Sequence, residues 1–328
     1  MIPFLVRLLG LVVVFAAVAG PGAQAQEKLR FIMVTHGAAT DAFWSTIKEG
    51  ADQAAADVDV ELVYRAPEEF DLDAMAALVT EAIAEKPAGL IVSIPNSDAL
   101  AKPIQAAVAA GIPVISINSG FDVGPALGAL LHVGQSEYEA GRVAGDAMRK
   151  AGGSKALCLN HELVNVALDL RCKGFIDGFS GSVEVVAVVN DPAEVQTAVA
   201  ERLAADSEID VILALNATIA GVPAIEAAKA LADRKVRVAT FDVSDAVLNA
   251  VADGAAAFAI DQQPFLQGYL PVQYLAVLAR EGVVPVSNVS TGPRLIGEAD
   301  AKKRLGRPVA SEESGGSAPA PEPEQSGG

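Results

Sequence analysis

Residues 89–118 read GLIVSIPNSDALAKPIQAAVAAGIPVISIN, and this stretch decides the fold class. It begins with a short apolar run at 89–94, continues through an alanine-rich amphipathic segment at 97–110, and ends in a second apolar run at 114–117. Gly111 stands just past the amphipathic segment, where the end of a helix favours glycine. Runs that are apolar throughout are typical of parallel strands with both faces covered. The stretch therefore predicts one strand–helix–strand unit of a parallel sheet.

The same alternation extends in both directions along the chain. Further strands are predicted at 29–35, 60–64, 156–159, 183–189, 211–215, 236–241 and 256–260. Further helices are predicted at 41–56, 71–85, 136–151, 165–179, 192–205, 217–232, 244–252 and 264–281. Strands that alternate with helices of this length predict βαβ units with right-handed crossovers, and so an α/β fold.

The alternation is divided into two similar halves. It pauses at 131–134 and restarts with the strand that begins at Ala156. The chain has 328 residues, which is more than one ordinary core and favours two domains. We expect each half to contain its own parallel sheet.

The first 25 residues have the order of a secretory signal. Arg7 precedes an apolar run at 8–19, and Gly20-Pro21-Gly22-Ala23-Gln24-Ala25 supplies a small-residue cleavage site. The run is shorter than the roughly 20 residues that span a bilayer, although an uncleaved anchor is the alternative. No cysteine stands directly after the run, which disfavours a lipid anchor. We expect cleavage after Ala25 and a mature protein in the periplasm or another extracytoplasmic space.

The opposite end of the chain has a different composition. Residues 311–328 are rich in serine, glycine, proline and glutamate, and almost free of apolar side chains. Such a segment buries too little apolar surface to offset the entropy of folding. We expect a disordered tail.

Charge excludes one class of partner. The formal net charge is −17, and no cluster of basic residues interrupts it. Such a chain repels the phosphate backbone of nucleic acids. We therefore expect no nucleic-acid binding.

Cys158 and Cys172 are the two cysteines of the chain. In an exported protein an even pair favours a disulfide. The loop between them is short, so a bridge contributes about 3 kcal/mol to stability in the chain-entropy model. The alternative is two free buried thiols, because bridging also requires suitably close Cα atoms.

Sequence signals for catalysis and cofactors are missing. The chain has no Gly-x-Gly-x-x-Gly after a strand, no glycine loop ending in Gly-Lys-Ser/Thr and no Gly-x-Ser-x-Gly elbow. His161 and Glu162 begin like a zinc-binding helix motif, but Asn165 stands where the second histidine is needed. We therefore expect no metal, no cofactor and no enzyme activity. A doubly wound sheet still has a crevice at the carboxyl ends of its strands, and this favours binding.

Several predicted strands end in polar side chains. Among the residues that follow strands are Ser93, Asn96, Asn118, Asn160, Glu162, Asn216, Asp242 and Gln262. Planar amides, carboxylates and guanidinium groups each bond two neighbouring hydroxyls, as recognition of a polyol requires. Helix N-capping is the alternative at any one asparagine or aspartate, but it does not explain Gln262 or Arg171.

Two aromatic rings stand at the start of the first predicted helix. Phe43 and Trp44, the only tryptophan, follow Asp41 soon after the first strand. Rings at this point cover the apolar faces of a sugar, while the Asp41 carboxylate accepts hydrogen bonds from hydroxyls. The alternative is that one ring packs between helix and sheet, because adjacent helical positions do not share a face.

Several segments, taken in order, resemble a known family. They are Asp41-Ala42-Phe43-Trp44, Lys48-Glu49-Gly50, Gly111-Ile112-Pro113-Val114, Gly141 to Gly145 before Asp146, Arg171 before Gly174-Phe175, Phe241-Asp242, and Gln262 before Pro264. Their order and spacing resemble those of the ribose-type periplasmic sugar-binding proteins of ABC importers, the type I class. The similarity covers nearly all of residues 29–297.

The resemblance implies two Rossmann-like lobes joined by three crossovers. The N-terminal lobe would hold residues 26–134 and 263–288, and the C-terminal lobe residues 135–262 and 289–310, with a last strand near 289–295. The implied ligand contacts are Asp41, Phe43, Trp44 and Asn118 from the first lobe, and Arg171, Asn216, Asp242 and Gln262 from the second. Ser93, Asn96 and Glu162 are further candidates. We expect Arg171 to pair with Asp242, and a Cys158–Cys172 bridge to hold the helix that carries Arg171.

Two departures from the family pattern bear on the ligand. Members often have Asn where Asp41 stands, and an Asp-Arg pair where Asn118-Ser119 stands. Both differences change the hydroxyl pattern that is recognised, so ribose itself is not the expected ligand. Pentose, hexose, deoxy-sugar, inositol and linear polyol stay open.

The function implied is capture of a monosaccharide or polyol between two lobes by hinge closure, and its delivery to the permease of an ABC importer. The protein is expected to act as a monomer. Three alternatives stay open: a sensor that feeds a chemoreceptor or kinase, the ligand-sensing module of a repressor, and a secreted enzyme on a similar scaffold. The export signal and the absence of a basic helix-turn-helix disfavour the repressor.

Overall fold

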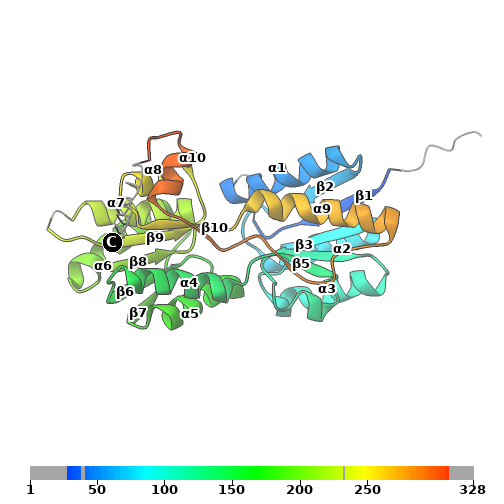
Figure 1. The fold of residues 1–328 in the computed structure, drawn as a ribbon. Coiled ribbons are helices and arrows are strands. Elements are labelled where there is room, and N and C mark those ends of the chain that lie inside the picture. The colour runs from blue at the N-terminus through cyan, green and yellow to red at the C-terminus, as the bar shows by residue number, and fades with distance from the viewer. Residues whose placement is uncertain (1–27, 38–40, 232, 310–328) are drawn as a thin grey trace, which may run out of the picture.

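The computed structural model describes residues 28–37, 41–231 and 233–309. Within these residues the chain forms two lobes, each built around a six-stranded sheet (Figure 1). The lobes lie end to end, with helices on both faces of each sheet. The expected α/β fold with two parallel-stranded lobes is therefore confirmed. The predicted signal at 1–25 and the predicted tail at 311–328 lie outside the described residues.

The first lobe contains a parallel sheet in the order β11-β5-β4-β3-β1-β2. Its strands are β1 (Arg30–Val34), β2 (Glu61–Arg65), β3 (Gly89–Ser93), β4 (Val114–Asn118), β5 (Leu131–Gly134) and β11 (Val289–Ser290). Its helices are α1 (Ala42–Asp57), α2 (Leu72–Ala84), α3 (Ser97–Ala109), α9 (Pro264–Glu281) and the short η1 (Pro125–Leu127). Phe31 packs with α1 and α9, whereas its neighbour Ile32 packs with α2 and α3. This double coverage explains why the strand is apolar throughout.

The second lobe repeats the arrangement in the order β12-β10-β9-β8-β6-β7. Its strands are β6 (Lys155–Asn160), β7 (Ser182–Ala187), β8 (Val211–Ala214), β9 (Arg237–Phe241), β10 (Phe258–Asp261) and β12 (Arg294–Ile296). Its helices are α4 (Glu137–Lys150), α5 (Val166–Phe179), α6 (Pro192–Ala205), η2 (Ala217–Gly221), α7 (Val222–Lys229), α8 (Asp245–Ala252) and α10 (Glu298–Arg304). Cys158 packs with α4 and α5, whereas its neighbour Leu159 packs with α6 and α7 on the opposite face.

Three connections join the lobes, from β5 to α4, from β10 to α9 and from β11 to β12. They are bonded to one another at the junction. The backbone N–H of Thr291 donates to the carbonyl oxygen of Gly134 at 2.7 Å, and its Oγ1 donates to that of Gln262 at 2.7 Å. Thr291, on the third connection, therefore ties together the other two.

Two strands differ from expectation. The pause at 131–134 is in fact β5, which lies inside the first sheet between β4 and β11. The last strand expected near 289–295 is divided: Val289–Ser290 pairs with β5 and Arg294–Ile296 pairs with β10. The reason is that the third connection falls within the predicted run, so 289–290 belong to the first sheet. The other lobe boundaries stay a prediction.

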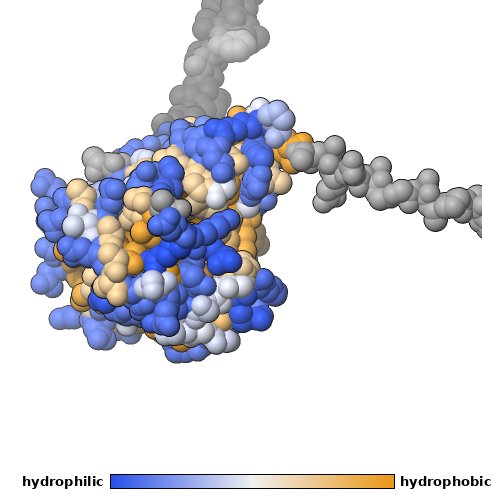
Figure 2. Space-filling view, turned by 90° about the vertical axis from the view of Figure 1, so that its left-hand side faces the viewer, coloured by the Kyte–Doolittle hydropathy of each residue, from blue (hydrophilic) through white to orange (hydrophobic). Residues whose placement is uncertain are grey.

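The outer surface is mixed in character. Hydrophilic residues cover most of the end of the second lobe in Figure 2, with smaller hydrophobic areas between them. Among the residues that the structure describes, no helix is both long enough and apolar enough to cross a membrane.

Candidate functional site

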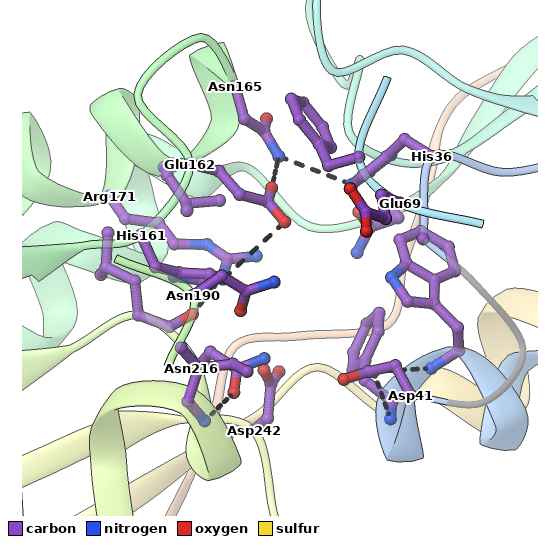
Figure 3. A pocket seen from close by; sticks show the side chains of 18 of the residues that line it. His36, Asp41, Glu69, His161, Glu162, Asn165, Arg171, Asn190, Asn216 and Asp242 are labelled. Carbon is purple, nitrogen blue, oxygen red and sulfur yellow. Dashed lines mark hydrogen bonds and ion pairs between the residues drawn. The ribbon is translucent and has the colours of Figure 1, made fainter. Parts of the chain in front are cut away.

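A cavity of about 650 Å³ opens between the lobes, and side chains from both of them line it (Figure 3). The first lobe contributes His36, Gly37, Asp41, Phe43, Trp44, Glu68, Glu69, Phe70 and Asn118. The second lobe and its connections contribute His161, Glu162, Asn165, Leu168, Arg171, Asn190, Leu215, Asn216, Ile219, Asp242 and Gln262. All the residues expected as main ligand contacts therefore line one cavity, together with Glu162. That they contact a ligand stays a prediction.

The start of α1 forms the aromatic side of the cavity. Asp41 is the N-cap of this helix, and its Oδ1 accepts hydrogen bonds from the backbone N–H groups of Phe43 and Trp44 at 2.8 and 3.3 Å. The two rings lie nearly perpendicular, with centroids 5.3 Å apart. Trp44 belongs to the core beside the first sheet and also lines the cavity. The first turn of α1 is therefore capped by Asp41, and Asp41, Phe43 and Trp44 of this turn also line the cavity.

Gly37 leaves room for the indole of Trp44. A Cβ atom at residue 37 would lie 1.9 Å from the indole nitrogen Nε1. The neighbouring His36 meets the Trp44 ring edge-on, with centroids 4.7 Å apart. The position of the tryptophan therefore depends on a backbone without a side chain at residue 37.

His36 is buried and neutral. Burial lowers the pKa of its imidazole to about 3. Its Nδ1 lies 2.8 Å from Ser93 Oγ, which also accepts a hydrogen bond from the His36 backbone N–H at 3.1 Å. On the other side, Nδ2 of Asn165 lies 3.5 Å from Nε2 of His36. Ser93 bonds His36 and lies outside the cavity lining, so its contact with a ligand stays a prediction.

Arg171 is held by partners on three sides. Its Nε donates to Glu137 Oε2 at 2.6 Å, its Nη1 to the carbonyl oxygen of Leu215 at 3.2 Å, and its Nη2 to Gln262 Oε1 at 3.1 Å. The guanidinium also lies 4.2 Å from the centre of the Phe241 ring. Each terminal nitrogen keeps another N–H, because a guanidinium NH₂ group carries two. Arg171 is therefore oriented by the protein and still able to donate into the cavity.

Close packing and a covalent bond place the helix that carries Arg171. A Cβ atom at Gly141 of α4 would lie 2.0 Å from the carbonyl oxygen of Arg171 on α5. Cys158 of β6 and Cys172 of α5 form a disulfide with their Cα atoms 5.9 Å apart. The expected disulfide is thus confirmed, and it joins α5 to the second sheet next to Arg171.

Asp242 does not pair directly with Arg171. Gln262 lies between them, because its Nε2 donates to Asp242 Oδ1 at 2.6 Å while its Oε1 accepts from Arg171. The carboxylate that pairs with Arg171 is Glu137, which corrects the expected ion pair. Burial raises the pKa of Asp242 to about 7, against the opposing effect of the Arg171 charge. The side chain is thus a carboxyl that lacks a direct cationic partner.

Asn118 and Asp242 have matching backbones in the two lobes. Asn118 ends β4 and Asp242 follows β9, and their φ angles are 57° and 70°. Left-handed backbone of this kind is tolerated by Asn and Asp better than by most other side chains. The two residues thus enter the cavity lining from corresponding strand ends.

Asn216 and Glu162 use one atom locally and present another to the cavity. Oδ1 of Asn216 accepts hydrogen bonds from the backbone N–H groups of Thr218 and Ile219, both at 2.8 Å, which leaves its Nδ2 group for other partners. Oε2 of Glu162 accepts from Asn165 Nδ2 at 2.8 Å. Burial raises the pKa of Glu162. Capping and ligand contact are therefore compatible roles for Asn216.

Asn96 lies at a contact between the lobes and not in the cavity lining. Its Oδ1 accepts from the backbone N–H of Ala99 at 3.2 Å, and its Nδ2 donates to the carbonyl oxygen of Val164 at 3.3 Å. Beside it, the N–H of Val166 donates to the carbonyl oxygen of Pro95 at 2.9 Å. The bond from Asn96 to Val164 and the bond from Val166 to Pro95 both join the first lobe to the second. That Asn96 contacts a ligand stays a prediction.

His161 lines the cavity without the other ligands of a metal site. Burial, with a contribution from the nearby Arg171, lowers the pKa of its imidazole to about 4. Within the described part of the chain, no group of His, Cys, Asp and Glu residues is arranged to hold a metal ion.

Sequence reasoning missed part of the lining. Glu68, Glu69 and Phe70 follow β2, and Asn190 follows β7. Residues that follow parallel strands face the crevice, and both loops follow such strands. Their positions in the sequence therefore could have identified these residues as part of the lining. Glu137 carries no such signal, because its role depends on the position of Arg171 on another helix.

Comparison with known proteins gives consistent matches. The model of a family described as "Periplasmic binding protein domain" matches residues 31–282. A carbohydrate transporter of Acidothermus cellulolyticus, solved in complex with myo-inositol, is 35% identical with a TM-score of 0.79, and the match covers 84% of this chain and 96% of that one. The xylose/arabinose-binding protein XylF of Sulfolobus acidocaldarius is 25% identical over 81% of this chain and 70% of its own length. The ribose import binding protein RbsB of Haemophilus influenzae is 27% identical over 70% and 79%.

Proposed function

Since this chain belongs to the periplasmic binding protein family, we propose that it captures a monosaccharide or cyclic polyol between its lobes and delivers it to an ABC importer. The observation that carries the proposal is the cavity itself, where donors and acceptors from both lobes converge beside aromatic rings. The solved relative bound to myo-inositol supports testing cyclic polyols first.

The lining suits a ligand rich in hydroxyl groups. Arg171 and Asn216 supply N–H donors, while Asp41 and Asp242 supply carboxylate oxygens. The rings of Phe43 and Trp44 offer apolar surface to the C–H faces of a ring-shaped polyol. A hydroxyl both donates and accepts, so such a ligand satisfies both kinds of group at once.

Closure of the lobes is the step that retains the ligand. Hydroxyl groups that bond Asp41 on one lobe and Asn216 on the other stabilise the closed arrangement over an open one. The bonds from Asn96 to Val164 and from Val166 to Pro95 already join the lobes beside the cavity. Ligand binding and closure are therefore coupled, without a covalent step.

A binding screen tests this proposal. Thermal shift against myo-inositol, ribose, xylose, arabinose, glucose and galactose, followed by calorimetry of each hit, is expected to identify a ligand with 1:1 stoichiometry. Asn216→Ala is expected to weaken binding, and Asn249→Ala, at a half-buried position of α8 outside the cavity lining, serves as the matched control. The proposal fails if neither these compounds nor a wider carbohydrate and polyol library binds.

Delivery to an importer and signalling to a receptor are separated by a cellular test. Under the proposed role, cells that lack this protein fail to take up the labelled ligand, and restoring the chain with its first 25 residues restores uptake. Uptake that persists while a behavioural or transcriptional response to the ligand is lost would instead support the sensor. Export is tested in the same cells by the position of the mature N-terminus, expected after Ala25.

A further inference from the structure

The charges that line the cavity are strongly unbalanced. Its carboxylates are Asp41, Glu68, Glu69, Glu162 and Asp242, whereas Arg171 is its one cationic side chain within the described lining. The two histidines do not offset this excess, because burial lowers their pKa values to about 3 for His36 and about 4 for His161. At neutral pH both imidazoles are uncharged.

The charge of Arg171 is already matched. Its Nε lies 2.6 Å from Oε2 of Glu137, and both side chains are buried. Glu137 does not line the cavity, so this ion pair adds no net positive charge to it. Burial raises the pKa values of Glu162 and Asp242 and the charge of Arg171 opposes this effect, but Arg171 and its counter-ion Glu137 together carry no net charge.

The carboxylates of the lining have only uncharged partners. Asp41 accepts from backbone N–H groups, Glu162 from the amide of Asn165, and Asp242 from the amide of Gln262. Within the described residues, none of the lining carboxylates forms an ion pair with Lys or Arg. Asp41, Glu68, Glu69 and Glu162 are thus able to accept a cation from a ligand, whereas Asp242, whose pKa burial raises to about 7, is partly protonated at neutral pH.

The aromatic rings of the lining also suit a positively charged group. Phe43, Trp44 and Phe70 line the same cavity, and the negative face of an aromatic ring attracts a cation. The rings do not favour an anionic ligand.

We infer that the preferred ligand is a polyol that carries an amino group, namely an amino sugar or an aminocyclitol, and that anionic sugars are excluded. This inference rests on the proposed function and narrows its substrate class. Glu162 from the second lobe and Glu69 from the first both point toward the space between the lobes (Figure 3). An ammonium group between them bonds both lobes, so the same charge that selects the ligand also favours closure.

Matched ligand sets test the inference by calorimetry. The sets are glucose, glucosamine and glucuronate; galactose, galactosamine and galacturonate; and myo-inositol with an inositol in which one hydroxyl is replaced by an amine. For any other neutral ligand that the screen finds, its amino and carboxylate counterparts form the set. The amine is expected to bind about ten-fold more tightly than its parent at low ionic strength, and the acid not at all. The advantage is expected to shrink in about 0.5 M salt, because salt screens exposed charges.

Two outcomes contradict the inference and differ in their meaning. If a neutral parent binds and its amine binds equally or more weakly, the inference fails while the proposed function stands. If no carbohydrate, polyol or amino derivative binds, the proposed function fails and the inference with it.

Charge-removing variants locate the effect. Glu162→Gln and Glu69→Gln keep the shape of the side chain, and each is expected to lower the ratio of amine to parent affinity several-fold. Glu194→Gln on the exposed face of α6 is the matched control, and it is expected to leave that ratio unchanged. An equal effect of all three variants would overturn the assignment, since a general loss of negative charge would then explain the preference.

Discussion

Arg171 and Glu137 form a buried ion pair, with Nε of Arg171 2.6 Å from Oε2 of Glu137. Glu137 is the first residue of α4 and follows the connection from β5, whereas Arg171 lies in the middle of α5. The pair therefore joins a cavity residue to the beginning of the second lobe, where the chain leaves the hinge. Gln262, on another connection between the lobes, also bonds Arg171. The orientation of the binding arginine thus depends on two hinge segments.

Glu137→Gln is expected to destabilise the protein by about 3–5 kcal/mol, because it leaves the buried guanidinium of Arg171 without its counter-charge. Denaturant unfolding measures this loss. Glu139→Gln is the matched control on the same helix, since its ion pair with Arg142 is half exposed and contributes about 0–1 kcal/mol. Similar losses in the two variants would contradict a special role for the buried pair.

Asp242→Asn is expected to change how stability depends on pH. Burial raises the pKa of Asp242 from 3.8 to about 7, so between these values the folded protein holds a proton that the unfolded chain has lost. The stability from this proton is complete below about pH 4 and is lost as the pH rises through about 7. Relative to the wild type, the variant should therefore gain stability as the pH rises from about 5 to about 8.

Denaturant unfolding of ligand-free protein at both pH values checks this shift. His36 and His161 act in the opposite direction, because their lowered pKa values cost stability as the pH falls. The difference between variant and wild type removes that shared contribution. A difference that does not change with pH would show that Asp242 is ionised at both values.

Trp44 is expected to report ligand binding by its fluorescence, because it is the only tryptophan and it lines the cavity. Gly37→Ala is expected to shift the emission of the ligand-free protein and to weaken binding at least several-fold, since the added Cβ would lie 1.9 Å from the indole nitrogen. Gly297→Ala, where a Cβ meets no atom within 4 Å and φ is −87°, is the matched control. Unchanged emission and affinity in Gly37→Ala would place the indole elsewhere.

Removal of the disulfide by Cys158→Ser with Cys172→Ser is expected to lower stability by about 3 kcal/mol, as the entropy of the short loop predicts. Affinity is expected to fall as well, because Cys172 adjoins Arg171 on α5. Reduction of the wild-type protein under native conditions serves as the parallel measurement. Unchanged melting temperature and ligand affinity in the double variant would remove the disulfide from the account of the site.

Asn96→Asp is expected to weaken ligand binding by a few-fold without loss of helix capping. The aspartate keeps an oxygen for the N–H of Ala99, but it cannot donate to the carbonyl oxygen of Val164 across the lobes. Small-angle scattering of the ligand-free protein should show a larger radius of gyration, because one bond between the lobes is lost. A more compact variant, or one with tighter binding, would contradict this role.

The amino-acid sequence by itself determined the architecture of this protein. Apolar runs such as 89–94, alternating with amphipathic segments such as 97–110, require a parallel sheet covered on both faces. Because strand ends in such a sheet meet at one edge, Asp41, Asn118 and Asp242 were predictable as neighbours of a single crevice. The relevant physics is local: side-chain period, helix caps and turn residues lie within a few positions of one another.

Only the tertiary structure decided how the polar groups are paired. Glu137, not Asp242, neutralises Arg171, and Gln262 separates those two side chains by bonding both. The tertiary structure also leaves Ser93 and Asn96 outside the cavity lining. It divides the last predicted strand between the two sheets. Such choices depend on which distant side chains come within hydrogen-bond distance at about 3 Å, and no spacing along the chain encodes that distance.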